Sequence, residues 1–312
     1  MSERAVQSET DDALRPYRIT EHQIPAAASQ PYICVEGPDR ALWFCESGAN
    51  RIGRFDPQTR TFSEFILPHE DSGPIGCAVG ADDCLWFAEK RGNRIGRISM
   101  AGDIDEFEVP MLSAGPDAVV LGPDNNIWVA ATDADTLLCI TPAGQITAVS
   151  DGISPGSKPL SISVRGGALW FSEAAASRIA SLVPGKRVIE YALPNPKAEP
   201  RATVAHPDGS LWFVETGGDA LGRVDADGTI TEHRVGGSGL SLRGVCVGPD
   251  ANLWFTENFA NRIGVMDPSG RMRGRLTIPT PNSGARCIVA HSNGRLYFTQ
   301  FDAGLIGEIY RE

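Results

Sequence analysis

The sequence repeats itself at a nearly constant spacing, and this repeat limits the possible folds more than any other feature. A large aromatic residue between apolar neighbours recurs every 42 or 43 positions. The seven copies are centred on Trp43, Trp86, Trp128, Trp170, Trp212, Trp254 and Tyr297. Each copy follows a turn such as GPDR or HPDG and precedes a second short apolar run such as IGRF or IGRI. A repeat of this length is typical of the blade of a β-propeller.

Each unit is predicted to contain four short strands, because alternating apolar segments are separated by closely spaced turn signals. The last unit ends one strand short, at IGEIY, whereas residues 17–25 (YRITEHQIP) resemble the fourth strands but precede the first unit. We therefore predict an all-β, seven-bladed propeller of four-stranded blades. It forms a single domain over residues 17–312, and the N-terminal strand completes the last blade. Residues 1–16 are predicted to be a flexible segment.

Composition restricts the partners of such a propeller. The 312 residues include 28 Lys and Arg against 39 Asp and Glu, a formal net charge of −11. This balance argues against binding to nucleic acid, which needs surplus positive charge. No apolar run approaches the roughly 18–20 residues of a membrane span, and the N-terminus lacks the apolar stretch of a secretion signal. The seven cysteines form no CxxC pair, so we expect a reduced, cytoplasmic monomer without membrane or nucleic-acid partners.

The topology of a propeller also predicts which residues surround its central channel. The turns after the first and third strands are tight and stereotyped, so the opposite face, with longer loops, is the expected functional face. The first residue of each innermost strand on that face should rim the channel: Tyr32, Ile75, Asp117, Leu160, Arg201, Arg243 and Arg286. Antiparallel pairing is expected to place the last residue of each second strand opposite these residues: Glu46, Glu89, Ala131, Glu173, Glu215, Glu257 and Gln300.

The units resemble those of the streptogramin B lyase (virginiamycin B lyase) family over essentially the whole chain. The resemblance rests on the pattern P-x-x-I/V-x-x-GPDGxLWFTE, NRIGRI and GxITEF, which is clearest at 242–266 and 31–55. It implies a seven-bladed propeller that linearises a cyclic depsipeptide by elimination, with Mg²⁺ and without addition of water. The family's chemistry uses a Glu-x-His pair, a second Glu and a second His. In this sequence all these positions are substituted, and they fall on Gly284, Arg286, Gln300 and Arg243.

Three consecutive rim positions carry arginine: Arg201, Arg243 and Arg286. The guanidinium group suits carboxylate and phosphate, so these residues predict binding of an anionic substrate, with Gln300 and Glu257 beside them. The alternative is that the arginines form structural ion pairs with glutamates of their own blades.

A metal site and a general base are less clearly marked. Glu199 and Glu215 keep a spacing of two carboxylates around a rim residue and could hold Mg²⁺ together with substrate and water. The alternative is an ion pair of either glutamate with Arg201. The candidates for a base are His69, in a loop of the expected functional face, and the rim or strand-end residues Tyr32, Glu46, Glu89 and Asp117.

Three functions remain open from the sequence. The first is a divergent lyase that eliminates a carbon–oxygen bond in a small carboxylate-bearing or cyclic, lactone- or depsipeptide-like metabolite, in antibiotic resistance or secondary metabolism. The second is a propeller hydrolase, isomerase or cyclase of secondary metabolism. The third is a non-catalytic propeller that binds a small anion or a protein.

Overall fold

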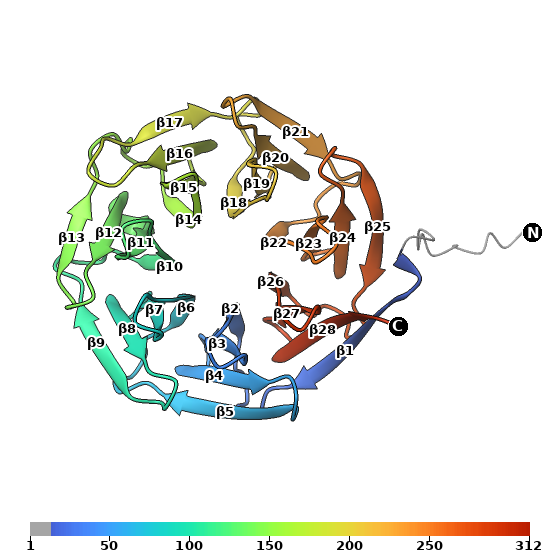
Figure 1. The fold of residues 1–312 in the computed structure, drawn as a ribbon, viewed down its shortest axis with the longest axis horizontal. Helices are drawn as coiled ribbons and strands as arrows, with labels where there is room; N and C mark the ends of the chain where they lie inside the picture. The colour runs from blue at the N-terminus through green and yellow to red at the C-terminus, as the bar shows by residue number, and fades with distance from the viewer. Residues whose placement is uncertain (1–13) are drawn as a thin grey trace, which may run out of the picture.

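Seven antiparallel sheets of four strands each stand around a central axis, as the repeat predicts (Figure 1). The structure is a computed structural model, and it describes residues 14–312. Most of the predicted flexible segment therefore lies outside the described residues. Leu14, at its end, is already buried with 3% of its surface exposed, so the packed part of the chain begins before residue 17.

The strands occupy four concentric rings. The innermost strands are β2 (Pro31–Glu36), β6 (Pro74–Val79), β10 (Pro116–Leu121), β14 (Pro159–Arg165), β18 (Pro200–Ala205), β22 (Leu242–Val247) and β26 (Ala285–Ala290). The second strands are β3 (Leu42–Glu46), β7 (Leu85–Glu89), β11 (Ile127–Ala131), β15 (Ala168–Glu173), β19 (Leu211–Glu215), β23 (Leu253–Glu257) and β27 (Leu296–Gln300).

The outer half of each blade follows the same order. The third strands are β4 (Arg51–Asp56), β8 (Arg94–Ile98), β12 (Thr136–Ile140), β16 (Arg178–Leu182), β20 (Ala220–Val224), β24 (Arg262–Met266) and β28 (Leu305–Arg311). The outermost strands are β5 (Thr61–Ile66), β9 (Ile104–Glu108), β13 (Ile146–Val149), β17 (Ile189–Ala192), β21 (Ile230–Arg234), β25 (Met272–Thr277) and, from the N-terminus, β1 (Tyr17–Gln23). A short 3₁₀ turn, η2 (Thr132–Ala134), follows β11.

The N-terminal strand closes the ring as predicted. β1 pairs with β28 over its whole length, from Tyr17 opposite Arg311 to Gln23 opposite Leu305. The two ends of the chain therefore share one blade (Figure 1). This pairing covers the edge of β28, which would otherwise expose unpaired backbone groups.

The repeated aromatic residue explains why each unit forms a blade. Trp43, Trp86, Trp212, Trp254 and Tyr297 are almost fully buried. In four blades the indole N–H also donates to the aspartate of the preceding GPD-type turn, for example Trp43 to Asp39 over 3.0 Å. The turn and the core residue thus hold each other in place.

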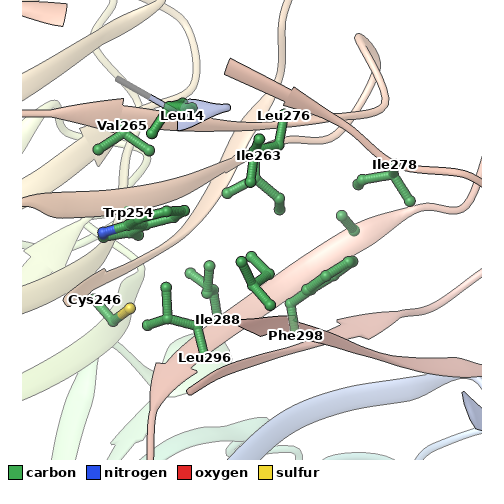
Figure 2. Packing of buried hydrophobic residues seen from close by; sticks show 12 residues of the cluster. Leu14, Cys246, Trp254, Ile263, Val265, Leu276, Ile278, Ile288, Leu296 and Phe298 are labelled. Atoms are coloured by element: carbon green, nitrogen blue, oxygen red, sulfur yellow. The ribbon is translucent and has the colours of Figure 1, made fainter. Parts of the chain in front are cut away.

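The blades pack face to face through apolar side chains. Between the sixth and seventh blades, Trp254 and Ile263 of one sheet lie beside Ile288 and Phe298 of the next, with Leu14 at the outer end (Figure 2). No helix in the described part of the chain is long and apolar enough to cross a membrane.

Candidate anion-binding site

A cavity of about 230 Å³ opens on the channel axis, between the innermost strands. Six of the seven predicted rim residues line it: Tyr32, Asp117, Leu160, Arg201, Arg243 and Arg286. The seventh, Ile75, is buried and is not among the lining residues. The aligned position of the repeat therefore places side chains from six different blades around one cavity.

A β-bulge in every innermost strand positions these rim residues. In each blade the register of the innermost strand shifts just after its first residue, for example between Pro31 and Cys34 and between Leu242 and Val245. Residues in a bulge are released from the regular ladder, which re-aims their side chains. In three blades a hydroxyl of the second strand accepts the freed N–H, as Thr256 Oγ1 does from Gly244 over 2.9 Å. The Ser or Thr of the LWFSE and LWFTE motifs has this role.

The three arginines face the cavity without a carboxylate partner. None of them forms an ion pair with any residue that the structure describes, so the alternative of structural ion pairs within the blades is wrong. The Nε atoms of Arg201 and Arg286 are buried and donate to no acceptor within residues 14–312. Burial, together with the charges of Arg201 and Arg286, lowers the pKa of Arg243 to about 10. The cavity wall therefore carries concentrated positive charge in a protein of net negative charge.

Two aromatic rings hold Arg286 at the wall. Its guanidinium carbon lies 3.8 Å from the ring centroid of Phe301 and 5.0 Å from that of Tyr32. The two rings meet edge to face, with centroids 5.8 Å apart. Cation–π contacts of this kind fix the orientation of a guanidinium group while leaving its N–H groups able to bind an anion.

Another residue of the cavity wall, Asp117, pairs with Lys90. The Lys90 Nζ lies 2.5 Å from Asp117 Oδ2. Burial raises the pKa of Asp117, while Lys90 and Arg201 act in the opposite direction. Asp117 is thus a buried carboxyl group on the cavity wall whose proton affinity is higher than that of an exposed aspartate.

The sequence did not single out Lys90 and Phe301, although both occupy the same position of the repeat, directly after the second strand. In other blades the residue at this position reaches toward the next blade: Thr132, Thr216 and Asn258 donate to the backbone carbonyls of Pro159, Leu242 and Ala285, respectively. An alignment of the units at this position would have predicted that Lys90 lies beside Asp117 of the next blade.

The strand-end glutamates lie elsewhere than predicted. Because of the bulge, Glu46 pairs with Pro31 rather than Tyr32, and Glu257 pairs with Leu242 rather than Arg243. The same shift applies in the other five blades, to Glu89, Ala131, Glu173, Glu215 and Gln300. All seven side chains are fully buried, and none lines the cavity. The predicted ring of carboxylates facing the rim arginines is therefore wrong.

These glutamates instead meet the outermost strand of their own blade. Glu46 lies over Gly53 of β4, which is paired with Glu64 of β5. Burial, and next the charge of Glu64, raise the pKa of Glu46 to about 8. Burial likewise raises the pKa of Glu89 to about 7 and those of Glu173 and Glu215 to about 8, with Glu106, Glu190 and Glu232 as the acidic neighbours.

In two blades other residues replace one or both members of this acidic pair. In the third blade both positions are alanine, Ala131 and Ala148, and Leu138 replaces the glycine between them. In the sixth blade Glu257 is instead held by Arg275 and Arg262, each with a nitrogen 2.7 Å from a carboxylate oxygen. In the first six blades this position is therefore filled by two carboxyl groups, by an ion pair or by apolar atoms.

The outer glutamate of each pair fastens a loop of the channel face. Glu64 accepts the N–H of Ala26 over 2.8 Å, Glu190 that of Ser154 over 2.6 Å, and Glu232 that of Asn195 over 2.7 Å. Glu106 instead contacts the imidazole of His69. His69 is half-exposed and is not among the cavity-lining residues.

The proposed metal ligands Glu199 and Glu215 do not line the same cavity. Glu199 lines an open groove of about 490 Å³ that adjoins the cavity through Leu160 and Arg201, whereas Glu215 is buried beside Glu232. In the described chain no three His, Cys, Asp or Glu residues gather as a metal site would require.

The donor set at the family's metal position does not suit Mg²⁺. It consists of Gly284, Arg286, Gln300 and Arg243, which supply no carboxylate, and guanidinium groups repel a cation. These residues therefore do not fit a Mg²⁺ ion at this position.

Comparison with known protein families shows which family has this architecture. The profile of the virginiamycin B lyase family matches residues 12–240. The chain belongs to this family. Comparison with curated proteins gives no match.

Solved structures of the virginiamycin B lyase family superpose closely. A streptogramin B lyase is 27% identical with a TM-score of 0.90, covering 96% of this chain and 100% of that one. Virginiamycin B lyase from Staphylococcus aureus is 26% identical with a TM-score of 0.90, covering 95% and 100%. A catalytically inactive variant of the Staphylococcus aureus enzyme with quinupristin is 25% identical with the same TM-score and coverage.

Proposed function

We propose that this family member binds a small anionic metabolite at the channel mouth and eliminates a carbon–oxygen bond in it. The observation that carries the proposal is the group of three rim arginines, Arg201, Arg243 and Arg286, without carboxylate partners around a cavity of about 230 Å³. Three guanidinium groups with free donors suit a carboxylate, and the adjoining groove offers room for the rest of a larger, cyclic substrate.

The same arginines supply what an elimination next to a carboxylate needs. When a base removes the α-proton, negative charge moves onto the carboxylate oxygens, and preorganised guanidinium groups stabilise that charge. The carbon–carbon double bond forms as the carbon–oxygen bond breaks, and the leaving oxygen takes a proton. Asp117 is the preferred base because it lines the cavity, and the ammonium of Lys90, which contacts Asp117, is the preferred acid. Tyr32 is the second candidate for proton transfer.

A non-catalytic role is the second candidate function. The family's catalytic positions here carry Gly284, Arg286, Gln300 and Arg243. Replacement of acids and bases by arginine and glutamine favours tight binding of an anion without turnover.

Binding is tested first, by calorimetry with small mono-, di- and tricarboxylates, phosphate and the corresponding neutral amides at constant ionic strength. We expect Arg243→Gln and Arg286→Gln each to weaken carboxylate binding about 10-fold or more, as expected for loss of a charge-assisted hydrogen bond. Arg54→Gln is the matched control, because Arg54 lies on β4 of the first blade, where it pairs with Asp39, and does not line the cavity. Binding that is unchanged in both rim variants would refute the anion site.

Turnover is tested with lactones and cyclic depsipeptides in water enriched in heavy oxygen. Elimination opens the ring without change of mass, hydrolysis incorporates labelled oxygen, and a purely binding protein leaves the compounds intact. In the lyase we expect Asp117→Asn to lose turnover by about 100-fold or more while retaining substrate binding.

A further inference from the structure

Two cysteines meet where the first and last blades adjoin. Cys34 belongs to β2 and Cys287 to β26, and their Sγ atoms are 3.8 Å apart. The Cys287 Sγ also lies 3.7 Å from the backbone oxygen of Cys34. Both sulfurs are free thiols in the structure, although 253 positions separate them in sequence. A disulfide requires the two sulfurs to approach from this distance to about 2.05 Å.

The surroundings of the pair favour reaction of one sulfur with the other. Hydrogen bonding from the Cys34 thiol lowers the pKa of Cys287, and the same contact raises the pKa of Cys34. Cys287 is thus the better nucleophile and Cys34 the proton donor. Both residues line the channel cavity, which gives a small oxidant a route to them even though only 2% and 8% of their surfaces are exposed.

We propose that Cys34 and Cys287 are an oxidation site that forms a disulfide across the closure of the ring. With hydrogen peroxide, the Cys287 thiolate attacks one oxygen, which gives a sulfenic acid and, after protonation, water. The Cys34 sulfur then attacks the sulfenic sulfur, and a second water leaves. Two thiols and one peroxide thus become one disulfide and two waters. The bond joins β2 of the first blade covalently to β26 of the last blade, which β1 completes.

This disulfide restricts the unfolded chain strongly, because the closed loop is long. It also strengthens the one joint of the ring where blades distant in sequence meet. The inference does not depend on the proposed anion binding, since it rests only on the two sulfurs and their access.

The experiment treats the full-length folded protein with hydrogen peroxide and maps peptides by mass spectrometry without reduction. We expect one cross-linked peptide pair containing Cys34 and Cys287, with loss of two hydrogens. We also expect a rise of the melting temperature that dithiothreitol reverses. The cross-link and the rise disappear in Cys34→Ser and Cys287→Ser but remain in Cys246→Ser, a buried cysteine of the neighbouring blade.

Three results would overturn the proposal. They are a cross-link of Cys77 to Cys34 or Cys45, sulfinic acid on single cysteines without a cross-link, and oxidation that occurs only after unfolding in urea. Peptide mapping of the wild-type protein decides among these results even if a serine variant fails to fold. Cys34→Ala and Cys287→Ala provide a second pair of variants for the same test.

Discussion

Arg286 illustrates how single residues define the site. Its guanidinium packs against the rings of Phe301 and Tyr32, whereas its Nε is buried without an acceptor in the described residues. The rings restrict the rotamers of a long side chain, which reduces the entropy lost when an anion binds. The neighbouring Arg243 has no such aromatic support and is held by Ser241 Oγ at 3.2 Å from its Nε.

We predict that Phe301→Leu weakens carboxylate binding about 3- to 10-fold, because a partly buried cation–π contact contributes roughly 1 kcal/mol. Calorimetric titration with the tightest carboxylate measures the effect. Phe259→Leu is the control, since Phe259 is 73% exposed in the corresponding loop of the sixth blade. Equal affinity of the Phe301→Leu variant and the wild type would show that the ring does not position Arg286.

At the scale of the strands, the acidic pairs make blade stability depend on pH. The pKa values of Glu46, Glu89, Glu173 and Glu215 lie at about 7 to 8 in the folded protein, above that of an exposed glutamate at about 4.3. The folded state therefore binds more protons than the unfolded state between these values. The resulting stabilisation is fully present below about pH 4.3 and is lost as the pH rises through about 8.

We predict that the melting temperature falls between about pH 5 and pH 8, and that Glu215→Gln makes this decline less steep. One such group contributes at most about 1.4 kcal/mol per pH unit to the slope of the unfolding free energy. Denaturant titrations at several pH values measure the slope. Identical slopes in the variant and the wild type would contradict a raised pKa of Glu215.

Glu257→Gln is predicted to behave differently, because Glu257 is paired with Arg262 and Arg275 rather than with a second acid. The substitution removes a charged acceptor from two guanidinium groups and should cost about 2 kcal/mol of unfolding free energy near pH 7. Denaturant titration of this variant beside Glu215→Gln separates an ion pair from an acid pair in the same structural position.

At the scale of the whole molecule, one polar cluster holds the two chain ends together. His22 of β1 has its Nε2 2.7 Å from Glu308 Oε2 of β28. Glu308 also contacts Arg295 and accepts a hydrogen bond from the Tyr297 hydroxyl over 3.2 Å. Its carboxylate is buried, and although burial alone would raise the pKa, His22 and Arg295 lower it to about 2. The cluster stabilises the blade that the N- and C-termini share.

We predict that His22→Ala destabilises the closure of the ring by about 2 kcal/mol, since it leaves the buried Glu308 with one partner fewer. Hydrogen exchange should show earlier loss of protection in β1 and β28 than in the other strands. His233→Ala is the matched control: His233 occupies the corresponding position of β21 but contacts Thr231 of its own strand. Uniform loss of protection over all blades would contradict a local role in closure.

Much of the fold could be predicted from the sequence, because each blade is encoded by a local sequence pattern that repeats along the chain. The Trp period determined the number of blades, and the YRITEHQIP segment determined how the ring closes. Alignment of the units identified Tyr32, Asp117 and the three arginines as rim residues. The family followed from the same motifs, as did the substitutions at 243, 284, 286 and 300.

Only the tertiary structure decided which side chains meet. A bulge of one position at the start of each innermost strand turns Glu46 and Glu257 away from the channel and leaves the arginines without partners, and periodicity cannot reveal such a local shift. The contacts of Cys34 with Cys287 and of His22 with Glu308 join residues more than 250 positions apart. These contacts exist because ring closure brings the two ends of the chain together. The sequence does not show them, because a repeat encodes each blade but not the register between strands that are distant in sequence.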